Sequence, residues 1–117
     1  MIVDDDRILR RLFGKKLSSI GLDIIYAANG QEGLQLALSH QPDLIILDIH
    51  MPVMSGNEML KRLRQESAYG ENVYVIVVTA DTLSTAIRNI DLADVVLQKP
   101  VSTPELRSTI NNYLANL

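Results

Sequence analysis

The sequence has no cysteine, and its 117 residues contain no long hydrophobic run and no block of basic residues. Without cysteine there is neither a disulfide framework nor a thiolate metal site, and we expect a reducing, cytoplasmic setting. No apolar stretch approaches the roughly 20 residues that span a bilayer, so no membrane contact is expected. The net charge of −3, without a basic block, also argues against direct binding of nucleic acid by this segment.

Three further signals of function are missing. The acidic N-terminus lacks the basic region of a signal peptide. The glycines match neither the phosphate-binding P-loop nor the dinucleotide-binding spacing. His40 and His50 have no partnered acid and no metal-ligand spacing, so we interpret both as surface residues.

The length predicts one domain with one core. Only residues 1–3 precede a run of acids, which is short for a strand at the centre of a sheet. We therefore expect residues 1–117 to be a single domain excised from a longer protein.

Strand and helix signals alternate along the whole chain. Short apolar or β-branched runs predict strands at 2–3, 23–27, 44–47, 73–78 and 95–97. Helical spacing predicts a first helix whose apolar residues are Ile8, Leu9, Leu12, Phe13, Leu17 and Ile20. A short helix is expected at 84–90, and the last helix is expected to bury Leu106, Ile110, Tyr113 and Leu114.

Capping signals support these helices. Asn29 with Glu32, and Ser102 with Glu105, have the spacing of a capping box and predict helix starts. Strands that alternate with helices predict an α/β fold with a parallel sheet, helices on both faces and right-handed crossovers.

Polar residues follow four of the predicted strands. Asp4 and Asp5 follow the first, Asp48 the third, Thr79 the fourth and Lys99 the fifth. The carboxyl ends of parallel strands meet at one edge, where open α/β sheets place their sites. We therefore expect a phosphoryl-accepting pocket at this edge.

Asp48 carries the chemistry in this interpretation. The alternative is that it merely ends a strand, but acids are rare at buried strand ends unless they are paired. Nothing nearby in the sequence pairs Asp48. As a nucleophile, an aspartate can form an acyl phosphate.

The three consecutive acids Asp4, Asp5 and Asp6 can be read in two ways. Acids favour the first turn of a helix, and we assign Asp6 to that role as an N-cap. Asp4 and Asp5 should instead face Asp48, where crowded carboxylates suit Mg²⁺. The cation would shield repulsion between these acids and an incoming phosphoryl group.

Thr79 and Lys99 are expected to contact that phosphoryl group. The alternatives are an ordinary strand threonine and a surface lysine. At strand exits, however, the hydroxyl could donate to a phosphoryl oxygen and the ammonium could offer a point charge. The bond between Lys99 and Pro100 is a candidate cis peptide.

Taken together, these motifs resemble the receiver domain of two-component response regulators over essentially the whole chain. The matching segments are 3–6, 47–56, 78–80 and 99–100. The resemblance implies a flavodoxin-like, doubly wound (βα)5 three-layer sandwich whose five-stranded parallel sheet has the order 2-1-3-4-5.

The resemblance also implies roles for the site residues. Asp48 would accept a phosphoryl group from a histidine kinase or a histidine phosphotransfer protein, and Thr79 and Lys99 would bind that group. The implied ligands of Mg²⁺ are Asp4, Asp5, Asp48 and the backbone carbonyl of His50. The domain would catalyse only its own phosphorylation and dephosphorylation, then signal to an output domain or a downstream protein; homodimerisation stays open.

Two departures from the family pattern affect how the domain would pass its signal to a partner. Val96 stands where many receivers carry an aromatic residue, and the interval from Thr79 to Lys99 is slightly short, which implies an abbreviated fourth helix. One alternative is therefore a receiver-like scaffold that works without phosphorylation, although a scaffold needs none of the site residues. Another is a phosphatase or phosphotransferase, but such enzymes commonly carry a second acid where this chain has His50.

Overall fold

The computed structural model of the chain describes residues 1–80 and 92–116. The expected helix at 84–90 lies outside the described residues. The elements, in chain order, are β1 (Ile2–Val3), α1 (Arg7–Ser18), β2 (Tyr26–Ala27), α2 (Gly30–His40), β3 (Leu44–Asp48), α3 (Gly56–Glu66), α4 (Ala68–Asn72), β4 (Tyr74–Thr79), β5 (Val95–Gln98) and α5 (Thr103–Ala115).

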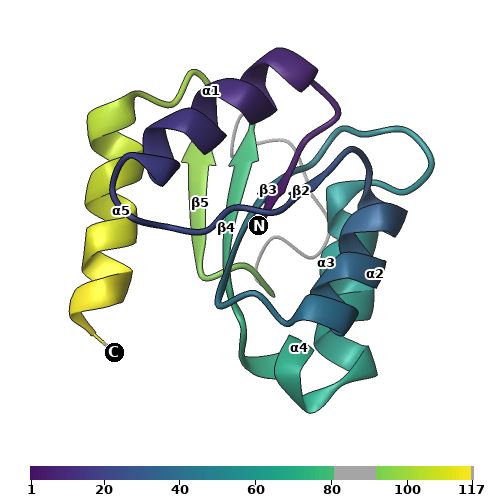
Figure 1. Cartoon of the computed structure of the whole chain (residues 1–117). Helices are drawn as coiled ribbons and strands as arrows, with labels where there is room; N and C mark the ends of the chain where they lie inside the picture. The colour runs from purple at the N-terminus through teal and green to yellow at the C-terminus, as the bar shows by residue number, and fades with distance from the viewer. Residues whose placement is uncertain (81–91, 117) are drawn as a thin grey trace.

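The strands form one five-stranded parallel sheet of order β2-β1-β3-β4-β5, which confirms the expected topology. Helices α1 and α5 cover one face, and α2 and α3 cover the other (Figure 1). In the strand register, Asp48 lies beside Val78 and Thr79 beside Gln98. The carboxyl ends of the central strands therefore meet at one edge of the sheet.

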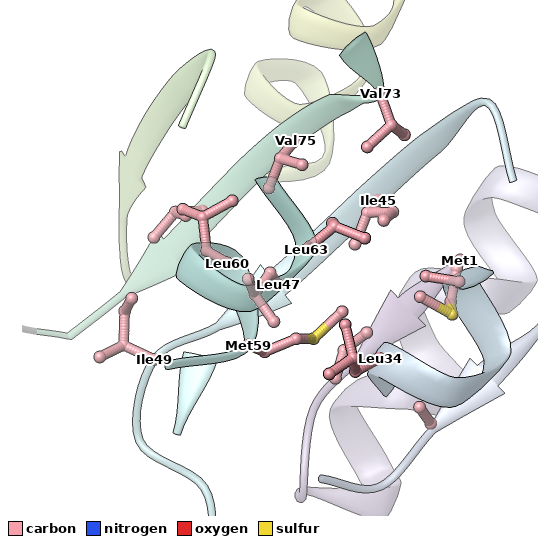
Figure 2. Close-up of a cluster of buried hydrophobic side chains, with 14 residues drawn as sticks. Met1, Leu34, Ile45, Leu47, Ile49, Met59, Leu60, Leu63, Val73 and Val75 are labelled. Atoms are coloured by element: carbon pink, nitrogen blue, oxygen red, sulfur yellow. The ribbon is translucent and has the colours of Figure 1, made fainter. Parts of the chain in front are cut away.

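Alternate strand residues supply the two halves of the core. Ile45, Leu47 and Val75 pack toward α3, where Figure 2 shows them beside Leu60 and Leu63. The opposite sheet face buries a second cluster against α1 and α5, formed by Ile2, Leu17, Ile46, Ile76, Val78, Leu97, Leu106 and Ile110. Because helices cover both faces of the sheet, the sequences of β3 and β4 are nearly continuous apolar runs. Burying each such side chain contributes roughly 1.5–3 kcal/mol.

The expected helix caps are present. Asn29 Oδ1 accepts a hydrogen bond from the Glu32 amide at 2.9 Å. Ser102 Oγ accepts one from the Glu105 amide at 3.2 Å. Asp6 caps α1 by accepting from the amide of Ile8 at 2.9 Å. Each acceptor satisfies a backbone donor that has no partner within its own helix.

Two helical faces are less buried than the sequence predicts. Ile8 is 70% exposed and Leu12 is 47% exposed, because the buried stripe of α1 runs instead through Phe13 and Leu17. With 3.6 residues per turn, Leu12 lies about 100° around the helix from Phe13, and Ile8 lies about 140° from it. On α5, Leu114 is likewise exposed at 41%.

The second strand is shorter than predicted, and one helix was not expected. Only Tyr26–Ala27 of the predicted strand at 23–27 is β-structure, because β1 offers two residues for pairing. The short helix α4 begins after Ser67, whose hydroxyl accepts from the Gly70 amide at 2.9 Å. None of the helices in the described ranges is long and apolar enough to cross a membrane.

Candidate functional site

Three polar side chains are buried at the carboxyl edge of the sheet. Asp4 follows β1 and is 4% exposed, Asp48 ends β3 and is 7% exposed, and Thr79 ends β4 and is fully buried. The flanking apolar runs hold these residues at the strand ends, as the sequence predicts. Buried carboxylates carry a desolvation penalty unless they are paired, so their partners decide what the site can do.

Lys99 is the partner of both buried acids. Its Nζ lies 3.2 Å from Asp48 Oδ1 and 3.6 Å from Asp4 Oδ2. The lysine side chain is 23% exposed, so its charge lies at the mouth of the site instead of in open solvent. No residue close to Asp48 in the sequence could be assigned as its partner, because Lys99 follows β5, much further along the chain.

The backbone around Lys99 is tied to the adjoining strand. The Lys99 amide donates to the Thr79 carbonyl at 2.7 Å. The Lys99–Pro100 peptide bond is cis, as the sequence suggests. The hydrogen bond to Thr79 places the lysine backbone beside the end of β4.

Asp5 completes an acidic group with the two buried carboxylates. One carboxylate oxygen from each of Asp4, Asp5 and Asp48 lies within 4.8 Å of the others. Asp5 is exposed, whereas Asp4 also accepts a hydrogen bond from the Asp6 amide at 2.9 Å. The Arg10 guanidinium donates to the Asp4 carbonyl at 2.7 Å and holds this turn against α1; sequence analysis gives Arg10 no role.

Burial and repulsion from neighbouring acids raise the pKa of both buried acids. For Asp48 the largest cause is desolvation, followed by the nearby Asp4 carboxylate, while Lys99 opposes both. For Asp4, desolvation again raises the pKa, opposed by the hydrogen bond from the Asp6 amide and by Lys99. A pair of buried acids with one shared cation is short of positive charge, which favours binding of a further cation.

The donor set fits Mg²⁺. Three carboxylates from one cluster provide hard oxygen ligands, and the exposed Asp5 leaves the group open to solvent, which suits an ion that retains waters. The backbone carbonyl of His50, the fourth expected ligand, follows directly on this segment, and the His50 side chain is exposed. Histidine, cysteine or thiolate ligands that would favour a softer metal are absent from the cluster in the described residues.

Gly56 is a structural requirement of the site that sequence analysis misses. A Cβ atom at this position would lie 2.0 Å from the backbone oxygen of Asp48. The Gly56 amide also donates to the Ile49 carbonyl at 2.8 Å. The start of α3 can therefore approach the Asp48 backbone only with glycine at position 56.

The loop between β3 and α3 contains a second backbone constraint. The Met54 amide donates to the Pro52 carbonyl at 2.8 Å, and Val53 between them has a φ of 70°. This is a γ-turn, a strained conformation for a β-branched residue. Val53 is 78% exposed, so packing of its side chain does not explain the strain.

The sequence of the chain matches the family model described as "response regulator receiver domain" over residues 1–111. It is 35% identical to the polar-differentiation response regulator DivK of Brucella anthropi, covering 99% of this chain and 95% of that protein. It is also 36% identical to the probable transcriptional regulator ycf27 of Porphyridium aerugineum over 97% of this chain. This chain spans about half of the ycf27 protein, 47% of its length.

Solved structures resemble the fold closely. The response regulator TrrA of Thermotoga maritima, in complex with Mg²⁺ and BeF, aligns with a TM-score of 0.85 and 31% identity, covering 95% of this chain and 94% of that one. A CheY-like receiver domain from Methanospirillum hungatei aligns with a TM-score of 0.87 and 27% identity, covering 98% and 91%.

Proposed function

This chain belongs to the response regulator receiver domain family, and from that membership we propose that it is a switch controlled by phosphorylation of Asp48. The observation that carries the proposal is the buried Asp48 carboxylate with the Lys99 ammonium at 3.2 Å and two further acids beside it. A strand terminus needs none of these neighbours. A phosphoryl acceptor needs a nucleophile, a cation for the transferred group and a means of shielding negative charge.

In the proposed transfer, a carboxylate oxygen of Asp48 bonds to phosphorus as the bond from phosphorus to the donor's imidazole nitrogen breaks. That nitrogen keeps the electron pair and takes up a proton. Asp48 must be ionised to attack, and Lys99 favours this form because its charge lowers the pKa that burial raises.

Asp4, Asp5, Asp48 and the backbone carbonyl of His50 would hold Mg²⁺. When bound, Mg²⁺ neutralises charge between the acids and the phosphoryl oxygens. The carboxylates of Asp4 and Asp5 lie close to that of Asp48. The Asp6 amide fixes the Asp4 carboxylate by donating a hydrogen bond to it.

After transfer, we infer that Lys99 moves its ion pair from Asp48 to a phosphoryl oxygen. The Thr79 hydroxyl, at the end of the neighbouring strand, donates to another oxygen of the same group. Phosphorylation therefore changes the contacts at the ends of β4 and β5 together. Since the Lys99 amide is bonded to the Thr79 carbonyl, the two strand ends respond as a unit.

The chain is a signalling domain, and its own Mg²⁺-dependent phosphorylation and dephosphorylation are the only catalysis that we propose. The donor is a histidine kinase or a histidine phosphotransfer protein, and the recipient of the signal is an output domain or a downstream protein. A cytoplasmic location remains part of this proposal.

Intact-mass spectrometry of the chain with acetyl phosphate tests the proposal. One phosphoryl adduct is expected with Mg²⁺, little without it, and none for Asp48→Asn. Lys61→Met, which replaces an exposed lysine on α3, is the control and should behave like the unsubstituted chain. If folded protein that binds Mg²⁺ gives no adduct with acetyl phosphate or with phosphoramidate, the proposal fails and the scaffold interpretation replaces it.

A further inference from the structure

The loop between β3 and α3 contains a strained residue that its own side chain does not explain. Val53 has a φ of 70°, which is unfavourable for a β-branched residue, and its side chain is 78% exposed. Such a conformation persists only where the surrounding structure imposes it, and it is often found at functional sites. The backbone contacts of the loop must therefore impose the strain.

Three backbone hydrogen bonds hold this loop. The Gly56 amide donates to the Ile49 carbonyl at 2.8 Å and closes the base of the loop against α3. The Met54 amide donates to the Pro52 carbonyl at 2.8 Å and closes the γ-turn. The Gly30 amide, from the first residue of α2, donates to the Met54 carbonyl at 3.0 Å. The loop is therefore fixed to α3 at its base and to α2 at its far side.

Position 30 requires glycine because of this close approach. A Cβ atom there would overlap the Met54 carbonyl oxygen and would lie 2.9 Å from the Ser55 carbonyl oxygen. Both are backbone atoms, so no side-chain rotation could make room. Gly30 does not have a positive φ, so it is the contact with the loop, and not conformational freedom, that excludes a side chain.

The end of α2 that carries Gly30 is itself fixed. Asn29 caps the helix, since its Oδ1 accepts a hydrogen bond from the Glu32 amide at 2.9 Å. Gly33 lets α2 lie close to α3, because a Cβ atom at Gly33 would lie 2.9 Å from Met59 Sδ. The two helices pack side by side on the same face of the sheet (Figure 1). The amide that holds the loop therefore belongs to a well-packed helix.

The loop held in this way carries one ligand of the proposed Mg²⁺ site. His50, whose backbone carbonyl is the fourth proposed ligand, lies in the chain between Ile49, which Gly56 holds, and the γ-turn. The other three proposed ligands are carboxylates. Residues that orient a metal ligand commonly change the metal affinity without touching the ion.

We propose that Gly30 is a positioning residue for the cation, an inference that rests on the Mg²⁺ site of the proposed function. By holding the Met54 carbonyl, the Gly30 amide fixes the far side of the loop, and the loop in turn holds the His50 backbone at the end of β3. The positive φ of Val53 turns the chain so that Met54 reaches Gly30. A ligand that is held in place before the cation arrives lowers the cost of binding.

Calorimetric titration with Mg²⁺ alone, without a phosphodonor, tests the role of Gly30. Gly70→Ala is the matched control for Gly30→Ala, because its Cβ would also overlap a backbone carbonyl oxygen, that of Leu63, but at the junction of α3 and α4. We expect both variants to lose stability. The Mg²⁺ dissociation constant should rise roughly tenfold or more for Gly30→Ala and stay within about twofold for Gly70→Ala.

Two substitutions of the exposed Val53 test the same loop without disturbing the core. Proline holds φ near about −65° and cannot adopt the γ-turn, whereas asparagine tolerates a positive φ. Val53→Pro should therefore weaken Mg²⁺ binding by roughly tenfold, and Val53→Asn should leave it within about twofold. If Gly30→Ala does not fold, this pair decides the question.

Three results would overturn the proposal. Equal weakening of Mg²⁺ binding by Gly30→Ala and Gly70→Ala would assign the effect to lost stability. Unchanged binding by Val53→Pro would show that the loop conformation does not set the affinity. Absence of Mg²⁺ binding by the unsubstituted chain would remove the site itself. The expected changes in Mg²⁺ affinity in a chain that gives no phosphoryl adduct would support the role of Gly30 and reject the proposed function.

Discussion

The Lys99 ammonium lies 3.2 Å from the Asp48 carboxylate, so one side chain joins the ends of β3 and β5 across the buried end of β4. The same ammonium lies 3.6 Å from Asp4 at the end of β1. A single cation therefore holds together the exits of several strands. Any group that draws Lys99 away from Asp48 also changes the balance of charge around Asp4.

Replacing Lys99 by methionine should destabilise the protein, because two buried carboxylates lose their shared cation. We expect the free energy of unfolding to fall by roughly 1–3 kcal/mol, less than for a fully buried pair since Lys99 is partly exposed. Urea unfolding of Lys99→Met, Asp48→Asn and the double variant measures the coupling. Additive effects of the two substitutions would contradict the ion pair.

Replacing Asp48 by asparagine should stabilise the protein at pH 7 without divalent cations. Burial and the Asp4 carboxylate raise the pKa of Asp48 above its ordinary value of 3.8, so the folded state keeps a proton that the unfolded state has lost. The free energy of unfolding of the unsubstituted chain therefore falls as pH rises from that value through the raised pKa. We expect Asp48→Asn to be more stable by on the order of 1 kcal/mol at neutral pH.

The pH dependence of the stability difference shows whether the gain comes from the raised pKa of Asp48 or from a general effect of the substitution. The advantage of Asp48→Asn should shrink as the pH falls through the raised pKa of Asp48, and it should level off below 3.8, where the carboxyl is protonated in both the folded and the unfolded state. Glu66→Gln, an exposed acid at the end of α3, provides the control and should show no such trend. A stability difference that stays constant with pH would show that the raised pKa of Asp48 is not the cause of the gain.

Gly56→Ala should disturb the site through the backbone of Asp48. The new Cβ would lie 2.0 Å from the Asp48 carbonyl oxygen, so α3 or the end of β3 must move. We expect a loss of about 2 kcal/mol of stability and an initial rate of phosphorylation lower by roughly tenfold or more. Gly14→Ala is the matched control, because the three nearest atoms that its Cβ would meet all belong to the half-exposed ring of Tyr26, which can swing away. Equal effects of the two substitutions would show that approach to Asp48 is not the constraint.

Val53→Asn should increase stability, since asparagine tolerates a positive φ better than a β-branched residue does. The gain should be roughly 0.5–1 kcal/mol, and little burial is lost because Val53 is 78% exposed. Val53→Ile keeps the β-branch and should give no gain. Thermal unfolding of both variants provides the comparison, and a loss of stability for Val53→Asn would mean that the valine side chain makes a favourable contact.

The central strands are predictable from sequence because both of their faces are buried. The predicted strands 44–47 and 73–78 each lie within one residue of β3 and β4 at both ends. Ile8 and Leu12 show the limit of the same pattern, because an apolar residue at helical spacing can lie beside the buried stripe instead of within it. Periodicity identifies the helix but not the width of its buried face.

The site could be predicted as a set of strand ends but not as a set of contacts. Asp4, Asp5, Asp48 and Lys99 each follow an apolar run, and the sheet topology brings such ends together. Lys99 pairs with both Asp48 and Asp4. These contacts depend on the side-chain conformation of Lys99, which no local sequence pattern predicts. The same holds for Gly56, whose importance comes from the backbone of a neighbouring segment.

The most direct test of the account is to locate the phosphoryl group in the phosphorylated chain. Reduction with borohydride converts an aspartyl phosphate to homoserine, which peptide mass spectrometry can place at a single residue. We predict homoserine at position 48 and unchanged aspartate at positions 4 and 5. Homoserine at position 4 or 5, or a phosphoryl group that survives on His50, would contradict the assignment of Asp48 as the acceptor.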